Sequence, residues 1–384
     1  MVLKTGAGWL AGASAVPTSL RAVFGYYADA GVFDYDSLAL KREVDRRTER
    51  MIDDVFALVE SELAAEFDRE SVSFEYDTKL VLPAQLTLGY VYRAARKRAA
   101  GDPVGDDIAT GVPAVDPDEM GPDPDLPPAE MVRRAEQMTR LAIEALIDGD
   151  MRDAINDDEF EDFAVDVDAD PRRVAEIAQS TLETDLQSKL DGLPPVVERT
   201  YRDAVEYSEA HQARDEHFRE LMTAAAEGDD DARRTIREEY KFADFEERPA
   251  IFSDEDLQLA YLRTQYARVG VLYDAMIDLY GLAGLDIEDA FAKAIVLAIV
   301  GAQVWLDDVD DYADDRREGQ LTPVTAEYFL APDDEAGYRR VVDVAEQYLD
   351  RAKAYATEAD SPLTGVAIEY IYRSGHPEVL PGSQ

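Results

Sequence analysis

The sequence contains no cysteine and only three histidines among its 384 residues. The lack of cysteine excludes disulfide bonds, thiolate zinc sites and thiol nucleophiles together. Imidazole chemistry is restricted to His211, His217 and His376. His211 and His217 are six residues apart, which separates them by about 240° around a helix. We therefore expect solvated polar side chains at these two positions rather than a metal site.

Basic side chains are scarce as well: 39 Lys and Arg stand against 83 Asp and Glu, a formal net charge of −44. Nucleic acid and anionic membranes are poor partners, because phosphate binding needs a basic face and no Lys/Arg-rich run is present. Molar salt screens such repulsion within about 3 Å. Since lysine is also sparse relative to arginine, we interpret the acidity as the adaptation of a halophilic protein. The alternative is a role in binding cations or basic partners.

Long apolar runs are limited to Ala290–Leu306, which is interrupted only by Lys293 and Gln303. The stretch is short for a bilayer span, contains a charge and ends directly in acids, which favours a buried core helix without stable membrane insertion. Near the N-terminus, residues 6–16 are broken by glycines and too weakly apolar for a signal peptide. We therefore expect a cytoplasmic protein.

Helical periodicity dominates the rest of the chain. Apolar residues recur at steps of three and four, or sums of these, in two long segments: Leu40, Val44, Met51, Val55, Leu58 and Leu63 in one, and Met131, Ala135, Met138, Ala142 and Ala145 in the other. The run Val72–Tyr76 alternates over too short a distance to anchor a sheet. The predicted fold is therefore all-α, a multi-helix bundle.

Two local signals mark helix starts. Asp170 before Pro171 predicts an N-cap with proline in the first turn, and that helix is expected to end near Gly192. Ser253 with Asp256 predicts a capping box, which opens a helix running to about residue 280.

Glycine, proline and aspartate crowd together between residues 101 and 128 without apolar periodicity. This composition predicts a mobile linker or surface loop. It divides the chain into an N-terminal helical region (1–100), the acidic linker or loop (101–128) and a helical bundle that carries the acidic motif (129–384). A long insertion within a single bundle is the equal alternative, because nothing shows that residues 1–100 bury a core alone.

A cluster of carboxylates follows the apolar stretch directly, from Asp307 to Asp315. Asp307, Asp311 and Asp315 are spaced by four residues, so a continuing helix places all three on one face, about 6 Å apart from turn to turn. With Asp308 they form the pattern DDxxDxxxD. These carboxylates repel one another, and they lie at a helix end whose dipole favours cations. A positive charge is expected nearby.

Three explanations of the cluster stay open. Hard divalent cations such as Mg²⁺ bind carboxylate oxygens together with water and substrate phosphates. Arg316, Arg317 or a neighbouring helix offers salt bridges instead. The third is a solvated acidic helix end, since a bare DDxxD is expected about once by chance in so acidic a chain. The longer pattern and its position after the most apolar segment are what favour the metal site.

The C-terminal third, about residues 253–373, resembles the class I isoprenoid synthase superfamily, which includes trans-prenyl diphosphate synthases and terpene synthases. In those families a long apolar helix leads into a second aspartate-rich motif, and Asp307, Asp308, Asp311 and Asp315 match the DDxxD form with its extra downstream acid. Gln303 is similar to the glutamine that precedes the motif in prenyl synthases, although it lies one residue too far upstream.

The resemblance implies an isoprenoid-synthase-like bundle in which these four aspartates hold Mg²⁺. It implies that Arg263 and Arg268, on the preceding helix, touch the diphosphate of a prenyl substrate, which is ionised for transfer or cyclisation. It also implies that apolar and aromatic walls shelter the carbocation, with Tyr266, Tyr273 and Trp305 as candidates, although core packing is the more ordinary explanation of these three residues. Tyr372-Arg373 is similar to the Arg-Tyr pair of terpene synthases in reversed order.

The chain also departs from the family pattern. The first aspartate-rich motif has no clear counterpart: residues 157–162 are acidic but read as a loop, and Asp274 with Asp278 stands on the helix just before the second motif. The Gly-Gly-Lys segment of the elongating enzymes is absent. The alternative function is therefore a non-catalytic all-helical interaction or assembly protein of a halophile. A homo-oligomer is compatible with either function.

Overall fold

The computed structural model describes residues 22, 26, 35–115, 117, 120–156 and 158–384. Helices make up 71% of the chain, and the described strands, β1 and β2, have two residues each. The all-α prediction is confirmed, while the likeness to isoprenoid synthases stays a prediction. The predicted lack of a signal peptide at residues 6–16 lies outside the described residues.

The chain divides into two compact units. Unit 1 comprises Met1–Asp34, Arg202–Ala275 and Glu288–Gln384, and unit 2 comprises Tyr35–Tyr201 and Met276–Ile287. Residues 101–128 lie inside unit 2. The predicted division into regions 1–100, 101–128 and 129–384 stays a prediction.

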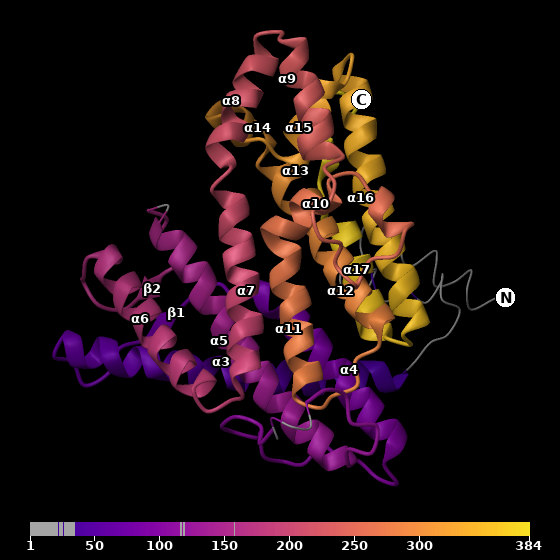
Figure 1. Cartoon of the computed structure of the whole chain (residues 1–384). Helices are drawn as coiled ribbons and strands as arrows, with labels where there is room; N and C mark the ends of the chain where they lie inside the picture. Colours follow the sequence, from indigo (N-terminus) through magenta and orange to yellow (C-terminus); the bar gives the residue numbers. More distant parts are fainter. Residues whose placement is uncertain (1–21, 23–25, 27–34, 116, 118–119, 157) are drawn as a thin grey trace. The chain divides into compact units, whose positions relative to one another are not determined.

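Unit 2 is built on four helices, which Figure 1 shows in indigo to magenta. Its elements are α3 (Tyr35–Glu66), β1 (Phe74–Glu75), the 3₁₀ turn η1 (Lys79–Val81), α4 (Leu82–Arg98), α5 (Pro128–Asn156), β2 (Ala164–Val165), α6 (Pro171–Leu190), the first turns of α7 (Pro195–Gln212) and the end of α11 (Val271–Leu282). The two strands pair antiparallel, with Phe74 opposite Val165. As predicted, Asp170 caps α6, its side chain accepting a hydrogen bond from the Arg172 N–H, and Pro171 occupies the first turn.

The two predicted apolar stripes form the core of unit 2. On α3 the stripe is buried at every predicted position except Leu58, which is half-buried, and on α5 at every predicted position except Ala145, also half-buried. Burial of these side chains on one face of each helix supplies the main stabilisation of the unit.

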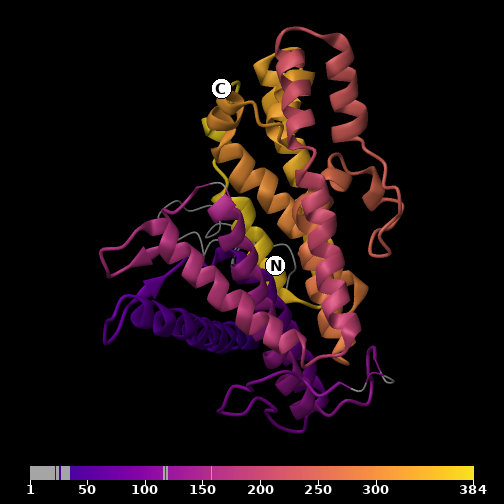
Figure 2. The same cartoon turned by 60° about the vertical axis from the view of Figure 1, so that its left-hand side comes forward.

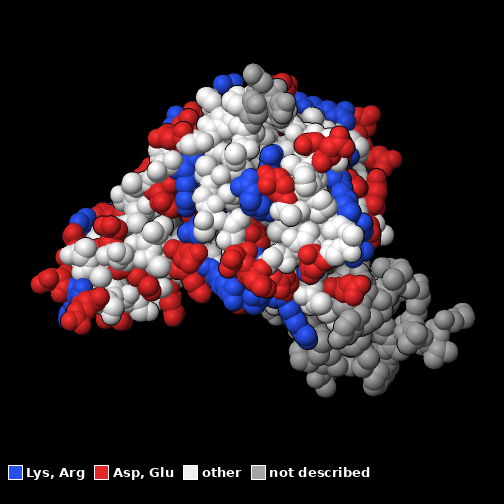
Figure 3. Space-filling view, turned by 90° about the horizontal axis from the view of Figure 1, so that it is seen from below, with Lys and Arg blue, Asp and Glu red and all other residues white. Residues whose placement is uncertain are grey.

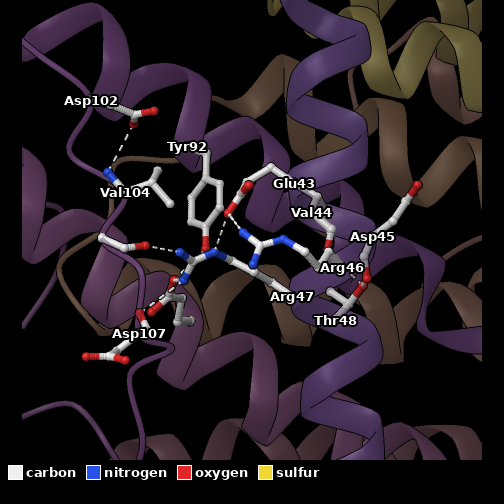
Figure 4. Close-up of polar contacts among 12 residues, drawn as sticks. Glu43, Val44, Asp45, Arg46, Arg47, Thr48, Tyr92, Asp102, Val104 and Asp107 are labelled. Carbon is white, nitrogen blue, oxygen red and sulfur yellow. Dashed lines mark hydrogen bonds and ion pairs between the residues drawn. The ribbon is translucent and has the colours of Figure 1, made fainter.

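The loop at residues 101–128 is held to the helices of unit 2 by a buried arginine (Figure 4). The Arg47 guanidinium on α3 donates to Glu136 on α5, to Glu43, and to the carbonyl oxygens of Gly105 and Asp107. Further along the loop, the Ala109 N–H donates to Glu136 at 2.7 Å, and Gln137 Nε2 donates to the carbonyl of Thr110, also at 2.7 Å. Residues 105–110 thus form a loop tied to the helices of unit 2, because a buried charge needs these carbonyls as partners, while the mobility of the segment stays a prediction.

Unit 1 contains the remaining helices, which Figure 2 shows in rose to yellow after a turn of the view. Its elements are the end of α7, α8 (Asp215–Ala226), α9 (Asp230–Thr235), η2 (Ile236–Lys241), η3 (Asp256–Gln258), α10 (Leu262–Gln265), η4 (Tyr266–Gly270), the start of α11 (Val271–Leu282), α12 (Asp289–Ala302), η5 (Gln303–Asp307), α13 (Asp308–Asp310), α14 (Tyr312–Glu318), α15 (Pro323–Leu330), α16 (Asp334–Glu358), α17 (Pro362–Ser374) and η6 (Pro377–Val379). The segments η2, η4 and η5 are π turns, and η3 and η6 are 3₁₀ turns.

The apolar helix α12 lies against α16 in the core of unit 1. Gly301 permits this close approach, since a Cβ at that position would lie 2.8 Å from Leu349 and 3.1 Å from Tyr348. By length and composition, the helical stretch Asp289–Asp310 is the one candidate for a membrane span among the described residues, and 61% of its most apolar window is buried inside the protein. The expected absence of membrane insertion stays a prediction.

The helix expected to run from Ser253 to about residue 280 is broken. Ser253 and Asp256 do bond reciprocally as in a capping box, but only the short turn η3 follows. Tyr261 then adopts the left-handed conformation, with φ of 66°, before α10 begins at Leu262. This conformation is costly for a bulky residue. The capping signal was read correctly, whereas the interruption before Leu262 was not predicted.

Acidic side chains are frequent on the described surface, but basic side chains lie between them. Figure 3 shows one face on which Asp and Glu side chains are spread over the described surface, with Lys and Arg side chains between them. Adaptation to high salt stays a prediction.

Candidate functional site

The aspartate cluster begins in a π turn and continues through two short helices. Asp307 ends η5, Asp308 opens α13, and Asp311 lies between α13 and α14. The backbone keeps its four-residue step across this junction: the Asp311 N–H donates to the Asp307 carbonyl and the Asp315 N–H to the Asp311 carbonyl, both at 2.9 Å. The expected succession of Asp307, Asp311 and Asp315 along one side of a helical path is therefore compatible with the backbone.

Burial separates the four aspartates. Asp307 and Asp311 are exposed and Asp315 is half-buried, but Asp308 is only 3% exposed. The Oδ2 atom of Asp308 has no hydrogen-bond partner among the described residues. Burial, reinforced by the charges of Asp307 and Asp315, raises the pKa of Asp308 well above its ordinary value, against the opposing effect of Arg268. Asp308 is thus the acid that most lacks a compensating partner.

The carboxylates of the cluster also act on one another. Burial and the neighbouring Asp311 raise the pKa of Asp315 to about 6, although Thr322 and Arg268 oppose the shift. Burial and Asp307 raise the pKa of Asp311. Gln303 donates its side-chain amide to Asp307. Mutual repulsion of this kind is relieved by a proton or by a bound cation.

Arg268 is the cation that faces the cluster. It lies in the π turn η4, and the Ser208 hydroxyl donates to its backbone carbonyl at 2.9 Å. Burial would lower the pKa of Arg268, but Tyr240 and the carboxylates of Asp308, Asp215 and Asp307 raise it above the ordinary value. No direct ion pair joins Arg268 to a carboxylate within the part of the chain that the structure describes. Its charge therefore acts on the cluster without a direct contact.

The arginines that follow the aspartate cluster in the sequence contact residues other than its four aspartates. Arg317 pairs with Asp314 at 2.6 Å and with Glu318 at 3.0 Å, and Arg316 donates to the Tyr312 hydroxyl at 2.8 Å. Arg373 pairs with Glu369 at 2.5 Å. Among the described side chains, none of these three arginines makes an ion pair with Asp307, Asp308, Asp311 or Asp315.

The predicted aromatic wall residues are all buried. Tyr266, Tyr273 and Trp305 are 6%, 9% and 5% exposed. Trp305 stacks on Tyr372 with ring centroids 6.0 Å apart and donates its indole N–H to the Tyr372 carbonyl. Tyr266 donates its hydroxyl to Asp274 at 2.6 Å. These contacts are typical of core packing, and they leave a role beside a carbocation untested.

His211 is buried, contrary to the expectation of a solvated residue. It lies in the last turn of α7 with 6% of its surface exposed, whereas His217 on α8 is exposed as expected. Burial, followed by the positive charges of Arg263, Arg214 and Arg268, lowers the pKa of His211 to about 4. The spacing of Ala204, Ser208 and His211 would have revealed this, because all three lie on one buried helical stripe.

Tyr240 was also missed from the sequence. It lies in the π turn η2, is 2% exposed, and donates its hydroxyl to the Leu321 carbonyl at 2.7 Å. Its ring packs edge-on against Phe218 and Tyr261, and its hydroxyl acts on Arg268. It thereby connects the arginine to the core of unit 1.

Comparison with protein-family models, with curated proteins and with solved structures gives no match. The site must therefore be interpreted from its own residues. In the described part of the chain, no group of three or more His, Asp or Glu side chains is arranged as it stands to hold a metal ion. The four aspartates nevertheless offer the hard oxygen donors that Mg²⁺ prefers, within one repelling cluster.

Proposed function

We propose that the protein is a magnesium-dependent, isoprenoid-synthase-like enzyme that ionises a prenyl diphosphate, leading to transfer or cyclisation. The observation that carries the proposal is the opposition of Arg268 to Asp307 and Asp308 within unit 1, without a direct ion pair. An arginine that acts on mutually repelling carboxylates suits a ligand with phosphate oxygens together with a divalent cation.

The aspartates supply the metal part of the proposal. Asp307, Asp308, Asp311 and Asp315 would hold Mg²⁺, and bound Mg²⁺ would neutralise the diphosphate and stabilise it as a leaving group. The raised pKa values of Asp311 and Asp315 support this, because ionised carboxylates repel one another there and a divalent cation would relieve the repulsion.

Arg263 and Arg268 supply the protein's own charge. Each guanidinium offers charge-assisted hydrogen bonds to diphosphate oxygens. The Nε atom of Arg263 is buried and lacks a hydrogen-bond partner among the described residues, so it has unused donor capacity. Tyr266, Tyr273 and Trp305 would supply π faces for a carbocation.

The second candidate is a non-catalytic helical protein that acts as an interaction or assembly partner. Two observations favour it: the described side chains form no ready-made group of three metal ligands, and Asp308 is buried where a protonated acid suits it better than a metal ion. In this case the cluster would be an acidic helix end with a buried member.

Binding of Mg²⁺ and pyrophosphate separates the two candidates. If the protein is the proposed enzyme, Mg²⁺ is expected to tighten pyrophosphate binding, and Asp311→Ala is expected to remove this enhancement. Asp314→Ala is the matched control, since Asp314 lies three residues further on in α14, is exposed and pairs with Arg317. Pyrophosphate binding that is unaffected by Mg²⁺ in the wild type, or an equal loss in both variants, would favour the non-catalytic protein.

A further inference from the structure

The outward face of α3 carries charge of opposite sign in its two halves. Residues recur on this face at steps of three and four, in the order Ala39, Arg42, Arg46, Arg50, Asp53, Ala57, Glu60 and Ala64. The first six are exposed and the last two are half-buried. We call these eight residues the α3 stripe. Its arginines lie in the first half of the helix and its acids in the second half.

The arginines of the stripe lie one above another. A spacing of four residues places like charges side by side on a helix, which lowers its stability. Arg46 pairs with Glu43 at 2.5 Å, whereas Arg42 and Arg50 make no ion pair with the described residues. Glu49, exposed beside the stripe, pairs with none of them. In a chain with a net charge of −44, this group of arginines suits contact with an acidic surface.

The acids of the stripe are only partly used within the chain. Asp53 makes no ion pair with the described residues. Glu60 accepts a hydrogen bond from the Phe74 N–H at 3.1 Å through Oε1, which leaves its second oxygen. Asp54, beside the stripe, is already paired with Arg140 at 3.0 Å. Asp53 and the second oxygen of Glu60 therefore remain for basic side chains from outside the chain.

Reversal of direction brings the unlike charges of two such stripes together. When two copies of α3 lie antiparallel, with Arg50 opposite Asp53 of the second copy, Arg42 comes within one residue of Glu60 of the second copy. Arg46 then falls between those two acids. A two-fold axis near the middle of the helix repeats each of these pairs, as in an isologous interface. A parallel arrangement would bring like charges together instead.

Small residues allow the two helices to approach. In the same antiparallel register, Ala39 lies level with Ala64 of the second copy, and Ala57 lies level with an arginine whose apolar stem covers it. The stripe spans about 38 Å at 1.5 Å per residue. Because exposed ion pairs contribute little each, an interface of this kind belongs to the weak, reversible class.

We propose that the α3 stripe is a self-association surface, through which two copies of this chain pair antiparallel, α3 against α3. The pairing depends on residues of unit 2 alone and is independent of the aspartate cluster and of the proposed function. Repulsion between two negative chains is long-range, and at about 0.5 M salt it is screened within about 4 Å. Pairs in direct contact survive such screening better, so association is expected under these conditions.

Sedimentation equilibrium in about 0.5 M potassium chloride, at up to about 1 mM protein, tests the surface. The wild type is expected to dimerise. Arg50→Asp and Asp53→Arg are each expected to weaken the dimer about tenfold or more, because each variant replaces two attractive pairs by two repulsive ones. Asp53→Arg also makes the net charge less negative, so general repulsion alone predicts the opposite change.

Mixing these two variants is expected to restore the dimer to within about threefold of the wild type, since opposite charges meet again at both symmetric positions. Restoration also establishes that both variants are folded. Lys41→Asp is the matched control: it alters the net charge as Arg50→Asp does, and it lies about 100° from Arg42 around the helix. A monomeric wild type, equal weakening by Arg50→Asp and Lys41→Asp, or no restoration in the mixture would overturn the surface.

Thiol cross-linking tests the orientation, because the chain contains no cysteine of its own. A mixture of Ala39→Cys and Ala64→Cys is expected to be joined by a short bis-maleimide. Either variant alone is expected to cross-link little, since about 38 Å separates the two equivalent positions in the antiparallel pair. Efficient cross-linking of either variant alone would show a parallel pair and contradict the proposal.

Discussion

The Arg47 guanidinium and the Glu136 carboxylate form an ion pair inside unit 2, with side chains only 1% and 2% exposed. Glu136 also accepts a hydrogen bond of 2.5 Å from the Tyr92 hydroxyl. Because Arg47 donates to the carbonyls of Gly105 and Asp107 as well, this one pair joins α3, α4, α5 and the loop at residues 101–128.

Removal of Arg47 is expected to destabilise unit 2 strongly. Arg47→Met leaves the buried Glu136 without its main countercharge, which costs about 3–5 kcal/mol of unfolding free energy. Urea unfolding measures this loss, and limited proteolysis is expected to cut the loop at residues 101–128 faster. Lys41→Ala is the control, since its pair with Asp45 is exposed and contributes little. A loss no larger than that of the control would show that the pair does not hold the loop.

Asp315→Asn is expected to raise stability at neutral pH. The folded-state pKa of Asp315 is raised from 3.8 to about 6, so the folded protein binds this proton more tightly than the unfolded chain does. Below pH 3.8 the Asp315 carboxyl is protonated in both states and does not lower the free energy of unfolding. As the pH rises from 3.8 through 6, the carboxyl ionises more readily in the unfolded chain, so the fold is increasingly destabilised. The gain in the variant is on the order of 1–3 kcal/mol at pH 7 and vanishes near pH 3.

Denaturant unfolding at several pH values measures this difference, and Asp314→Asn, exposed on the same helix, is the comparison. A gain that is constant with pH would exclude titration of Asp315 as the cause. Carboxyl carbon NMR adds a direct test, because Mg²⁺ bound at the cluster is expected to lower the Asp315 pKa toward its ordinary value.

Molar potassium chloride is expected to raise the thermal unfolding midpoint. With 83 acidic and 39 basic residues, the folded chain concentrates like charges that salt screens. Scanning calorimetry between about 0.1 and 2 M salt measures the shift, with sucrose as an uncharged stabiliser for comparison. A midpoint that is unchanged or lower in salt would contradict the interpretation of the composition as halophilic.

The helices of unit 2 were predicted well because the residues within each helix, and those next to its ends, determine where it forms. The apolar stripes of α3 and α5 and the Asp170 cap of α6 depend only on spacing and on the first turn. The contacts of the loop at residues 101–128 were not predicted because they come from Arg47, more than 50 residues earlier in the chain. A long-range buried ion pair leaves no periodic trace in a sequence.

The site was predicted less completely than the helices. Asp308 was included among the four aspartates, but its burial was not predicted, although Val304, Asp308 and Tyr312 form a buried stripe at steps of four. That pattern, available from the sequence, marks Asp308 as the inward-facing acid. The π turn that contains Arg268 could not be predicted, because no local residue signal in the sequence marks its extra residue.

Release of pyrophosphate from prenyl diphosphates of increasing chain length tests the central claim most directly. The account predicts release that requires Mg²⁺, is lowered at least about a hundredfold by Asp311→Asn or Arg268→Gln, and survives in Asp314→Asn. Absence of release with every chain length from folded wild-type protein in Mg²⁺, or equal loss in Asp311→Asn and Asp314→Asn, would contradict it.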